Sequence, residues 1–184
     1  MGNVMEVPPA ALIAGILFHG REHLEGALDM LTGEFGDIEM RSPVFDFDMT
    51  DYYTAEMGED LKKQFICFNR PVDMASLSDI KLTTNSMEKD LARPENEKLS
   101  RRVNIDPGYI TLSKLVLATT KDYSHRIFIG RGIFAETTLR YMKGTFASLD
   151  TTYPDYRTPL ALEFFNTVRD FVKRNRHIWI RKNE

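Results

Sequence analysis

The stretch Ala10-Ala-Leu-Ile-Ala-Gly-Ile-Leu-Phe18 decides the fold. It is the longest uninterrupted apolar run of the chain, and Pro8-Pro9 and Gly20 bound it. A short apolar run between turn residues predicts a strand that is buried on both faces. It is also far shorter than the roughly 20 residues that a membrane-spanning helix needs. We therefore expect this strand in the interior of a sheet.

Outward from this strand, further strands alternate with helices. The pattern predicts a helix over Arg21–Leu31, a strand from Ile38 to Phe47 that is broken near Pro43, a strand over Lys62–Asn69, a helix from Pro71 to Leu91, a polar linker over Arg93–Ser100 and a strand over Arg102–Ile105. This order predicts an α+β protein with a ferredoxin-like split β-α-β core. Its antiparallel or mixed sheet would form one layer and two helices the other.

The rest of the chain is expected to extend that core. The pattern predicts a turn at Asp106-Pro107-Gly108, a short helix over Leu112–Thr119, and a hairpin of Arg126–Ile129 and Ile133–Glu136 that Gly130-Arg131-Gly132 closes. It also predicts a strand over Leu139–Phe146 and a last helix that Thr158 caps and Pro159 begins. The sequence has no internal repeat, low-complexity stretch or domain boundary, so residues 1–184 are predicted to form a single domain.

Composition excludes several classes of protein. The 184 residues are 42% apolar and 28% charged, with a net charge of -3, which excludes a disordered chain. A single cysteine, Cys67, excludes an internal disulfide framework, and we expect it to be an unreactive core thiol of a cytoplasmic protein. Charge is uneven, because the first 60 residues hold 13 acidic and 2 basic side chains. The remaining residues could then form a basic face that attracts phosphate, unless they and the acidic first 60 residues neutralise each other in one sheet.

Three motifs resemble known ligand sites, but the sequence favours none of these sites. Gly15 to Glu22 has P-loop glycine spacing, but Arg21 and Glu22 stand where lysine and a hydroxyl are needed. His19 and His23 fit a zinc peptidase string, but a strand end and Gly20 separate them. The acidic cluster around Asp46, which includes Asp48, Asp51 and Glu56, could hold magnesium, although a solvated strand end is the preferred interpretation. We expect no metal site, and the sequence indicates no particular cofactor.

The stretch from Arg101 to Arg126 is the best candidate site. Its cations, its amide and the carboxylate of Asp106 are gathered around a turn, a short helix and a hairpin base, and such groups bind phosphate or carboxylate. The alternative is a basic surface that faces the acidic first third.

A likeness to a known family rests on several short strings of residues, among them Lys81-Leu-Thr-Thr-Asn85, Asn104-Ile-Asp-Pro-Gly-Tyr109, Gly132-Ile-Phe-Ala-Glu136 and Tyr153-Pro-Asp-Tyr-Arg157. Together they resemble domain-of-unknown-function family 4416, a prokaryotic family of similar length. The resemblance covers nearly the whole chain and implies a single-domain bacterial protein of unknown activity. Some family members carry the label GTP-binding protein, but this sequence has no working P-loop and no Asn-Lys-x-Asp string to bind guanine.

The polar members of these strings fall in expected turns, where a ligand site on loops would place them. We expect an anion-binding set of Lys81, Asn85, Arg102, Asn104, Tyr109, Lys114, Lys121, Arg126, Asp155 and Arg157, with Tyr52 and Glu56 nearby. Asp106 or Glu136 would act as general base and His125 as acid.

The first functional hypothesis is therefore a small enzyme or binding domain for an anionic, phosphate-bearing or nucleotide ligand. It requires Asp106 and at least one of Lys114, Lys121, His125 or Arg126 to line one pocket. The second is a nucleic-acid-binding module that uses the basic tail from Arg169 and the ring of Trp179, although overall acidity makes nucleic acid an improbable partner. The third is a protein-interaction adaptor. The sequence indicates no oligomeric state.

Overall fold

The apolar run Ala10–Phe18 forms strand β1, and all of its residues are buried, as predicted. Strand β4 (Lys62–Val72) pairs with one edge of β1 and strand β7 (Val103–Ile110) with the other, both antiparallel. The computed structural model describes residues 2–3, 7–95 and 98–181. Within them the fold is α+β, as predicted.

The main sheet has nine strands, and all of their pairings are antiparallel. Its order is β11-β10-β8-β7-β1-β4-β2, with β3 also on β4 and β9 also on β10. The other strands of this sheet are β2 (Ile38–Arg41), β3 (Phe45–Asp46), β8 (Lys114–Thr119), β9 (Ile127–Gly130), β10 (Ile133–Met142) and β11 (Thr145–Ser148). A separate hairpin is formed by β5 (Arg93–Glu95) and β6 (Lys98–Ser100).

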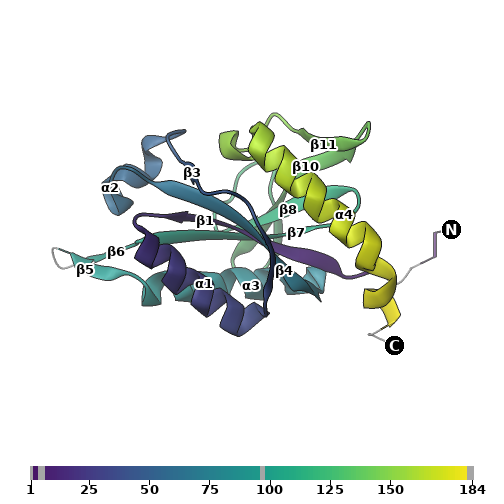
Figure 1. Ribbon diagram of the computed structural model, residues 1–184, viewed down its shortest axis with the longest axis horizontal. Coiled ribbons are helices and arrows are strands. Elements are labelled where there is room, and N and C mark those ends of the chain that lie inside the picture. The colour runs from purple at the N-terminus through teal and green to yellow at the C-terminus, as the bar shows by residue number, and fades with distance from the viewer. Residues whose placement is uncertain (1, 4–6, 96–97, 182–184) are drawn as a thin grey trace.

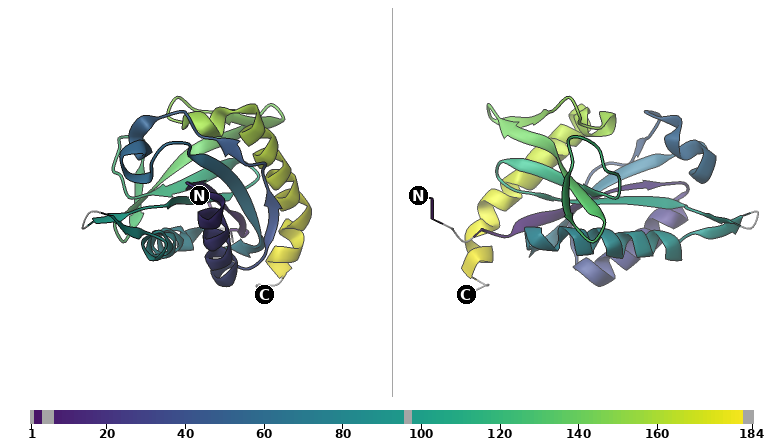
Figure 2. Two further views of the ribbon diagram at one scale, coloured as in Figure 1. Left: turned by 60° about the vertical axis from the view of Figure 1, so that its left-hand side comes forward. Right: turned by 180° about the vertical axis from the view of Figure 1, so that it is seen from behind.

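Helices cover both faces of the sheet. Helices α1 (Arg21–Phe35) and α3 (Leu77–Asp90) lie on one face, and α4 (Pro159–Arg181) crosses the other (Figures 1 and 2). Alternate residues of β1 serve the two layers, since Leu12 packs in the cluster with α1 whereas Ile13 packs in the cluster with α4. The short helices are η1 (Asp51–Tyr53), α2 (Thr54–Met57), η2 (Met74–Ser76) and η3 (Pro154–Arg157).

The last helix begins as its sequence predicts. Pro159 is its first residue, and the hydroxyl of Thr158 accepts a hydrogen bond from the Ala161 amide at 3.2 Å.

Four predictions about local structure are wrong. Leu112–Thr119 does not form a helix, because Lys114–Thr119 is strand β8. Asp106-Pro107-Gly108 is not a turn but the middle of β7. The polar linker Arg93–Ser100 contains the hairpin β5–β6. The strand predicted over Leu139–Phe146 is two strands, which turn at Lys143 and Gly144, both with positive φ.

Pro107 and Gly108 determine how far β7 pairs with β8. The Ile105 amide donates to Glu88, so the backbone N–H of Ile105 faces away from β1. Every second residue of an antiparallel strand directs its backbone groups to the same edge, so the nitrogen of Pro107 also faces away from β1. Pro107 has no N–H for a further ladder bond, and β7 pairs with β8 only from Gly108 to Ile110. A Cβ on Gly108 would lie 2.3 Å from the Val116 carbonyl oxygen, so glycine permits the close approach of β8. Beyond this short ladder β7 and β8 are no longer paired with each other, although β7 stays paired with β1 and β8 with β10.

None of the helices in the described ranges is both long enough and apolar enough to cross a membrane.

Candidate functional site

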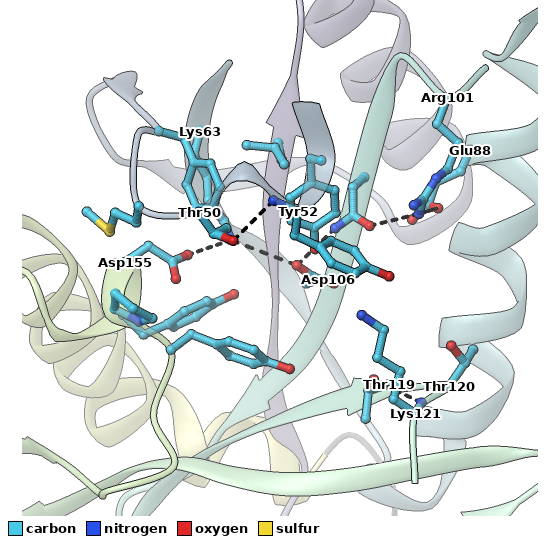
Figure 3. Close-up of a pocket in the computed structure, with 18 of the residues that line it drawn as sticks. Thr50, Tyr52, Lys63, Glu88, Arg101, Asp106, Thr119, Thr120, Lys121 and Asp155 are labelled. Atoms are coloured by element: carbon cyan, nitrogen blue, oxygen red, sulfur yellow. Dashed lines mark hydrogen bonds and ion pairs between the residues drawn. The ribbon is translucent and has the colours of Figure 1, made fainter. Parts of the chain in front are cut away.

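A cavity of about 790 Å³ is bordered by the unpaired ends of β7 and β8 and by α3, η1 and η3. This volume lies within the roughly 300–1,000 Å³ of small-molecule sites. Figure 3 shows the Asp106 carboxylate in its centre, with Asp155 and Lys63 on one side and Glu88 and Arg101 on the other. The charged lining residues are Lys63, Lys81, Glu88, Lys89, Arg101, Asp106, Lys121 and Asp155.

Asp106 lies between two lysines. Its Oδ1 is 3.8 Å from Lys81 Nζ, its Oδ2 is 3.8 Å from Lys63 Nζ, and Oδ2 also accepts a hydrogen bond from Asn104 Nδ2 at 3.0 Å. Its side chain is 29% exposed, whereas those of Glu88 and Asp155 are 6% and 5% exposed. Asp106 is therefore the carboxylate of this cavity that a ligand can reach most easily.

Lys63 and Asp155 form a buried ion pair at the inner end. The Nζ–Oδ2 distance is 2.6 Å, and Nζ also lies 4.9 Å from the centre of the Tyr156 ring. Gly15 leaves room for both, because a Cβ there would lie 2.7 Å from the Tyr156 hydroxyl and 3.0 Å from Lys63 Cε. The Tyr156 hydroxyl is buried without a hydrogen-bond partner among the described residues.

Lys81 and Glu88 close the free edge of β7. The Ile105 carbonyl accepts a hydrogen bond from Lys81 Nζ at 2.7 Å, and the Ile105 amide donates to Glu88 Oε1 at 2.7 Å. Two side chains of α3 thus replace the strand that the ladder lacks. Burial raises the pKa of Glu88 and favours its neutral form.

Arg101 is held by a carboxylate behind the cavity wall. Its Nε and Nη2 donate to the two oxygens of Glu56 at 2.7 and 2.6 Å, and Nη1 donates to Asn104 Oδ1 at 3.1 Å. These hydrogen bonds lower the pKa of Glu56 and raise that of Arg101. Arg101 is thus a fixed and largely neutralised cation.

The two other cations stand nearer to solvent. Lys121 is exposed, and its Nζ lies 4.0 Å from the centre of the Tyr52 ring, which is itself exposed. Lys89 is also exposed. Neither lysine makes an ion pair with the acidic residues that the structure describes. The mouth of the cavity is therefore its electropositive part.

Aromatic rings form much of the remaining wall. They belong to Phe47, Tyr52, Tyr53, Tyr123, Tyr153 and Tyr156. Burial raises the pKa of Tyr153 to about 12, so its hydroxyl keeps its proton at neutral pH. Ring faces of this kind hold flat or ring-shaped ligands.

Arg126, Glu136 and His125 form a group behind the wall. Arg126 Nε donates to Glu136 Oε2 at 2.7 Å, and His125 Nε2 lies 3.0 Å from the same oxygen. Arg126 also donates to the Lys121 carbonyl at 3.0 Å and to the Tyr153 hydroxyl at 2.5 Å. The group thus holds two lining residues in place without lining the cavity itself.

The structure brings six of the thirteen predicted residues together, namely Lys81, Asn85, Asn104, Asp106, Lys121 and Asp155. Asp106 and Lys121 line the same cavity, which is the geometry that the anion hypothesis requires.

Seven predicted residues do not line it, namely Arg102, Tyr109, Lys114, His125, Arg126, Glu136 and Arg157. Tyr109 packs beside α3, and burial raises its pKa. Lys114 lies at the far end of β8 and does not share a helical face with Lys121. Arg102 accepts a backbone hydrogen bond from His19, and Arg157 donates to the carbonyls of Asp150 and Thr152.

Sequence reasoning missed Lys63. It lies in a strand that appeared wholly buried, and the signal was present, because a lysine on the same face as Phe65 and Cys67 requires a partner. The partner, Asp155, is remote in sequence and could not be identified without the fold.

The other motifs do not form sites. Within residues 7–95 and 98–181, no three His, Cys, Asp or Glu side chains are placed to hold a metal ion. Asp46 pairs instead with Lys62 at 2.5 Å, and the ring of His23 bonds to the His19 carbonyl. Trp179 packs against Phe171, with ring centres 5.6 Å apart, and is not available for base stacking. The end of the basic tail, residues 182–184, lies outside the described residues.

The model of one family, described as a domain of unknown function (DUF4416), matches residues 8–171. None of the curated proteins and none of the solved structures matches the chain.

Proposed function

This chain belongs to the DUF4416 family, a domain of unknown function, so we propose its function from the cavity itself: it binds a small anionic molecule there. The observation that supports this proposal most strongly concerns two lysines at the mouth, Lys89 and Lys121. They have no acidic partner in the described parts of the chain. An anion gains most where a cation is not already neutralised.

The balance of charge around the cavity supports this proposal. If Glu56 is counted, five cations face four carboxylates, and burial favours the neutral form of Glu88. Lys63, Lys81 and Arg101 are engaged by Asp155, Asp106 and Glu56, so the excess positive charge lies at the mouth.

In this proposal Asp106 is the catalytic residue that acts on the bound molecule, because its carboxylate is the most exposed one of the wall. His125 and Glu136 are positioning residues, since Glu136 contacts Arg126 and His125 contacts Glu136, and His125 also stacks on the lining residue Tyr123, with ring centres 6.2 Å apart.

We also infer a ferredoxin-like core within one domain. In the sheet, β4 lies between β1 and β2, and α1 connects these two strands along the chain. Strand β7 follows α3 along the chain and lies on the other side of β1. These positions support the inference.

The test is a thermal-shift screen of nucleotides, sugar phosphates, and di- and tricarboxylates. A ligand at 100 times its dissociation constant adds about 2.7 kcal/mol to the free energy of unfolding, so a binder raises the melting temperature by several degrees. Lys121→Met should abolish most of this shift. Lys114→Met, at the start of β8 and outside the cavity, should preserve it. The proposal is wrong if no anion stabilises the protein, or if both variants respond like the wild type.

A further inference from the structure

The cavity has two chemically different ends, and their separation defines the ligand more closely. Tyr52 and Lys121 at the mouth are exposed, whereas Lys63, Asp155 and Tyr156 at the inner end are buried. The unneutralised cations are at the mouth, and the inner cations are paired. A ligand with its charge at one end would therefore bind with that end outward.

The mouth matches one phosphate group. Lys121 supplies a cation, and Thr119 and Thr120 place hydroxyls next to it in the wall, while Lys89 adds a second positive charge. A phosphate monoester carries about −1.5 to −2 at pH 7, which two lysines balance. A triphosphate would bring more negative charge than they can balance, and it would lie nearer to Asp106.

The centre of the cavity, where Asp106 lies, matches a neutral group that donates hydrogen bonds. A carboxylate accepts hydrogen bonds, and that of Asp106, whose side chain is 29% exposed, is the most exposed carboxylate of the wall. A ligand that placed a second anion here would be repelled by Asp106. A hydroxyl or an amino group would instead be bound.

Aromatic rings also line the wall, from the exposed Tyr52 at the mouth to the buried Tyr156 at the inner end. Tyr52, Tyr123 and Tyr153 come from three separate segments and all line the cavity. Tyrosine faces bind both the flat rings of nucleobases and the C–H faces of sugars. The ligand therefore contains a ring.

We propose that this cavity binds a phosphate monoester of a ring compound, with its phosphate on Lys121 at the mouth and a hydrogen-bond donor of the ring end on Asp106. This inference rests on the proposed function, because it assumes that the anion binds in this cavity. Nucleoside monophosphates and sugar phosphates share this chemistry.

Calorimetric titration with matched probes tests the proposal. The probes are the four ribonucleoside monophosphates, their nucleosides and triphosphates, ribose 5-phosphate, glucose 6-phosphate and inorganic phosphate. We expect at least one monoester to bind about tenfold or more tightly than both its unphosphorylated form and its triphosphate. The best monoester then shows whether a nucleoside or a sugar supplies the ring.

Two variants test the orientation. Lys121→Met should remove most of the difference between the monoester and its unphosphorylated form. Asp106→Asn should weaken both forms by a similar factor and leave their ratio unchanged. Because Asp106 contacts two buried lysines, its variant is first compared with the wild type by circular dichroism. If it does not fold, the wild-type probe series and Lys121→Met decide the matter.

The failures of the two proposals differ. A dicarboxylate or triphosphate that binds more tightly than every monoester, in a manner dependent on Lys121, would overturn this inference and leave anion binding intact. Equal binding of a monoester by wild type and Lys121→Met would overturn this inference together with the proposed function. If no probe and no anion of the thermal screen binds, anion binding itself fails.

Discussion

Lys63 is a buried cation of the site, and Asp155 offsets the cost of its burial through the 2.6 Å ion pair. Both side chains are 5% exposed, so water cannot replace either partner. Removal of Asp155 leaves the buried Lys63 with only the more distant carboxylate of Asp106, at 3.8 Å, and a buried charge that loses its close partner destabilises the fold. The pair thus makes the inner end of the cavity part of the stability of the fold.

We expect Asp155→Asn to lower the free energy of unfolding by about 3–5 kcal/mol, because Lys63 loses its buried counter-charge. Urea denaturation measures the loss. The double variant Lys63→Met, Asp155→Leu should be more stable than Asp155→Asn, because it leaves neither charge unpaired. If Asp155→Asn changed the free energy by less than about 1 kcal/mol, the pair would not carry this role.

Strand β7 combines three roles in three consecutive residues. Asp106 supplies the central carboxylate, Pro107 ends the ladder to β8, and Gly108 lets β8 approach. The length of the cavity along the sheet is therefore set by backbone chemistry.

Gly108→Ala is expected to destabilise the protein by about 1–3 kcal/mol, because its Cβ would collide with the Val116 carbonyl oxygen. Gly33→Ala in α1 is the matched control. Its Cβ would meet nothing within 4 Å, and alanine favours a helix over glycine by up to about 1 kcal/mol, so this variant should gain stability. Denaturation of both variants under one condition makes the comparison. Equal stability of the two would contradict the close approach of β8.

The elements that sequence patterns predicted correctly are those with one consistent signal. β1 is apolar throughout and bounded by turn residues, and α4 has a cap, an initial proline and an apolar stripe. Lys114–Thr119 was ambiguous, because a short apolar run fits a buried strand as well as a helix. Pro107-Gly108 has the composition of a turn, and only the position of α3 shows that it ends a ladder.

At the scale of the whole molecule, two apolar layers enclose β1 and β4. One layer contains α1 and α3, the other α4, and Cys67 lies in the α4 layer with 0% exposure. Burial raises the pKa of the Cys67 thiol, so the reactive thiolate is suppressed in the folded protein.

Cys67 should therefore report on unfolding of the whole molecule. We expect no measurable alkylation by iodoacetamide in native buffer over the time in which the urea-unfolded protein reacts completely. The urea concentration at which the thiol becomes reactive should coincide with the midpoint of the circular dichroism transition. Reaction of the native protein at the rate of free cysteine would show that the α4 layer opens independently.

The register of β7 against β1 also protects the cavity from errors of folding. In the native register Asp106 lies opposite Gly15, and Ile105 lies in the layer beneath α1. A slip by one residue would turn the carboxylate into that apolar layer and the isoleucine into the cavity. Such a misfolded chain would lose its core together with its binding site, so quality control that recognises exposed apolar surface would remove inactive molecules without testing their activity.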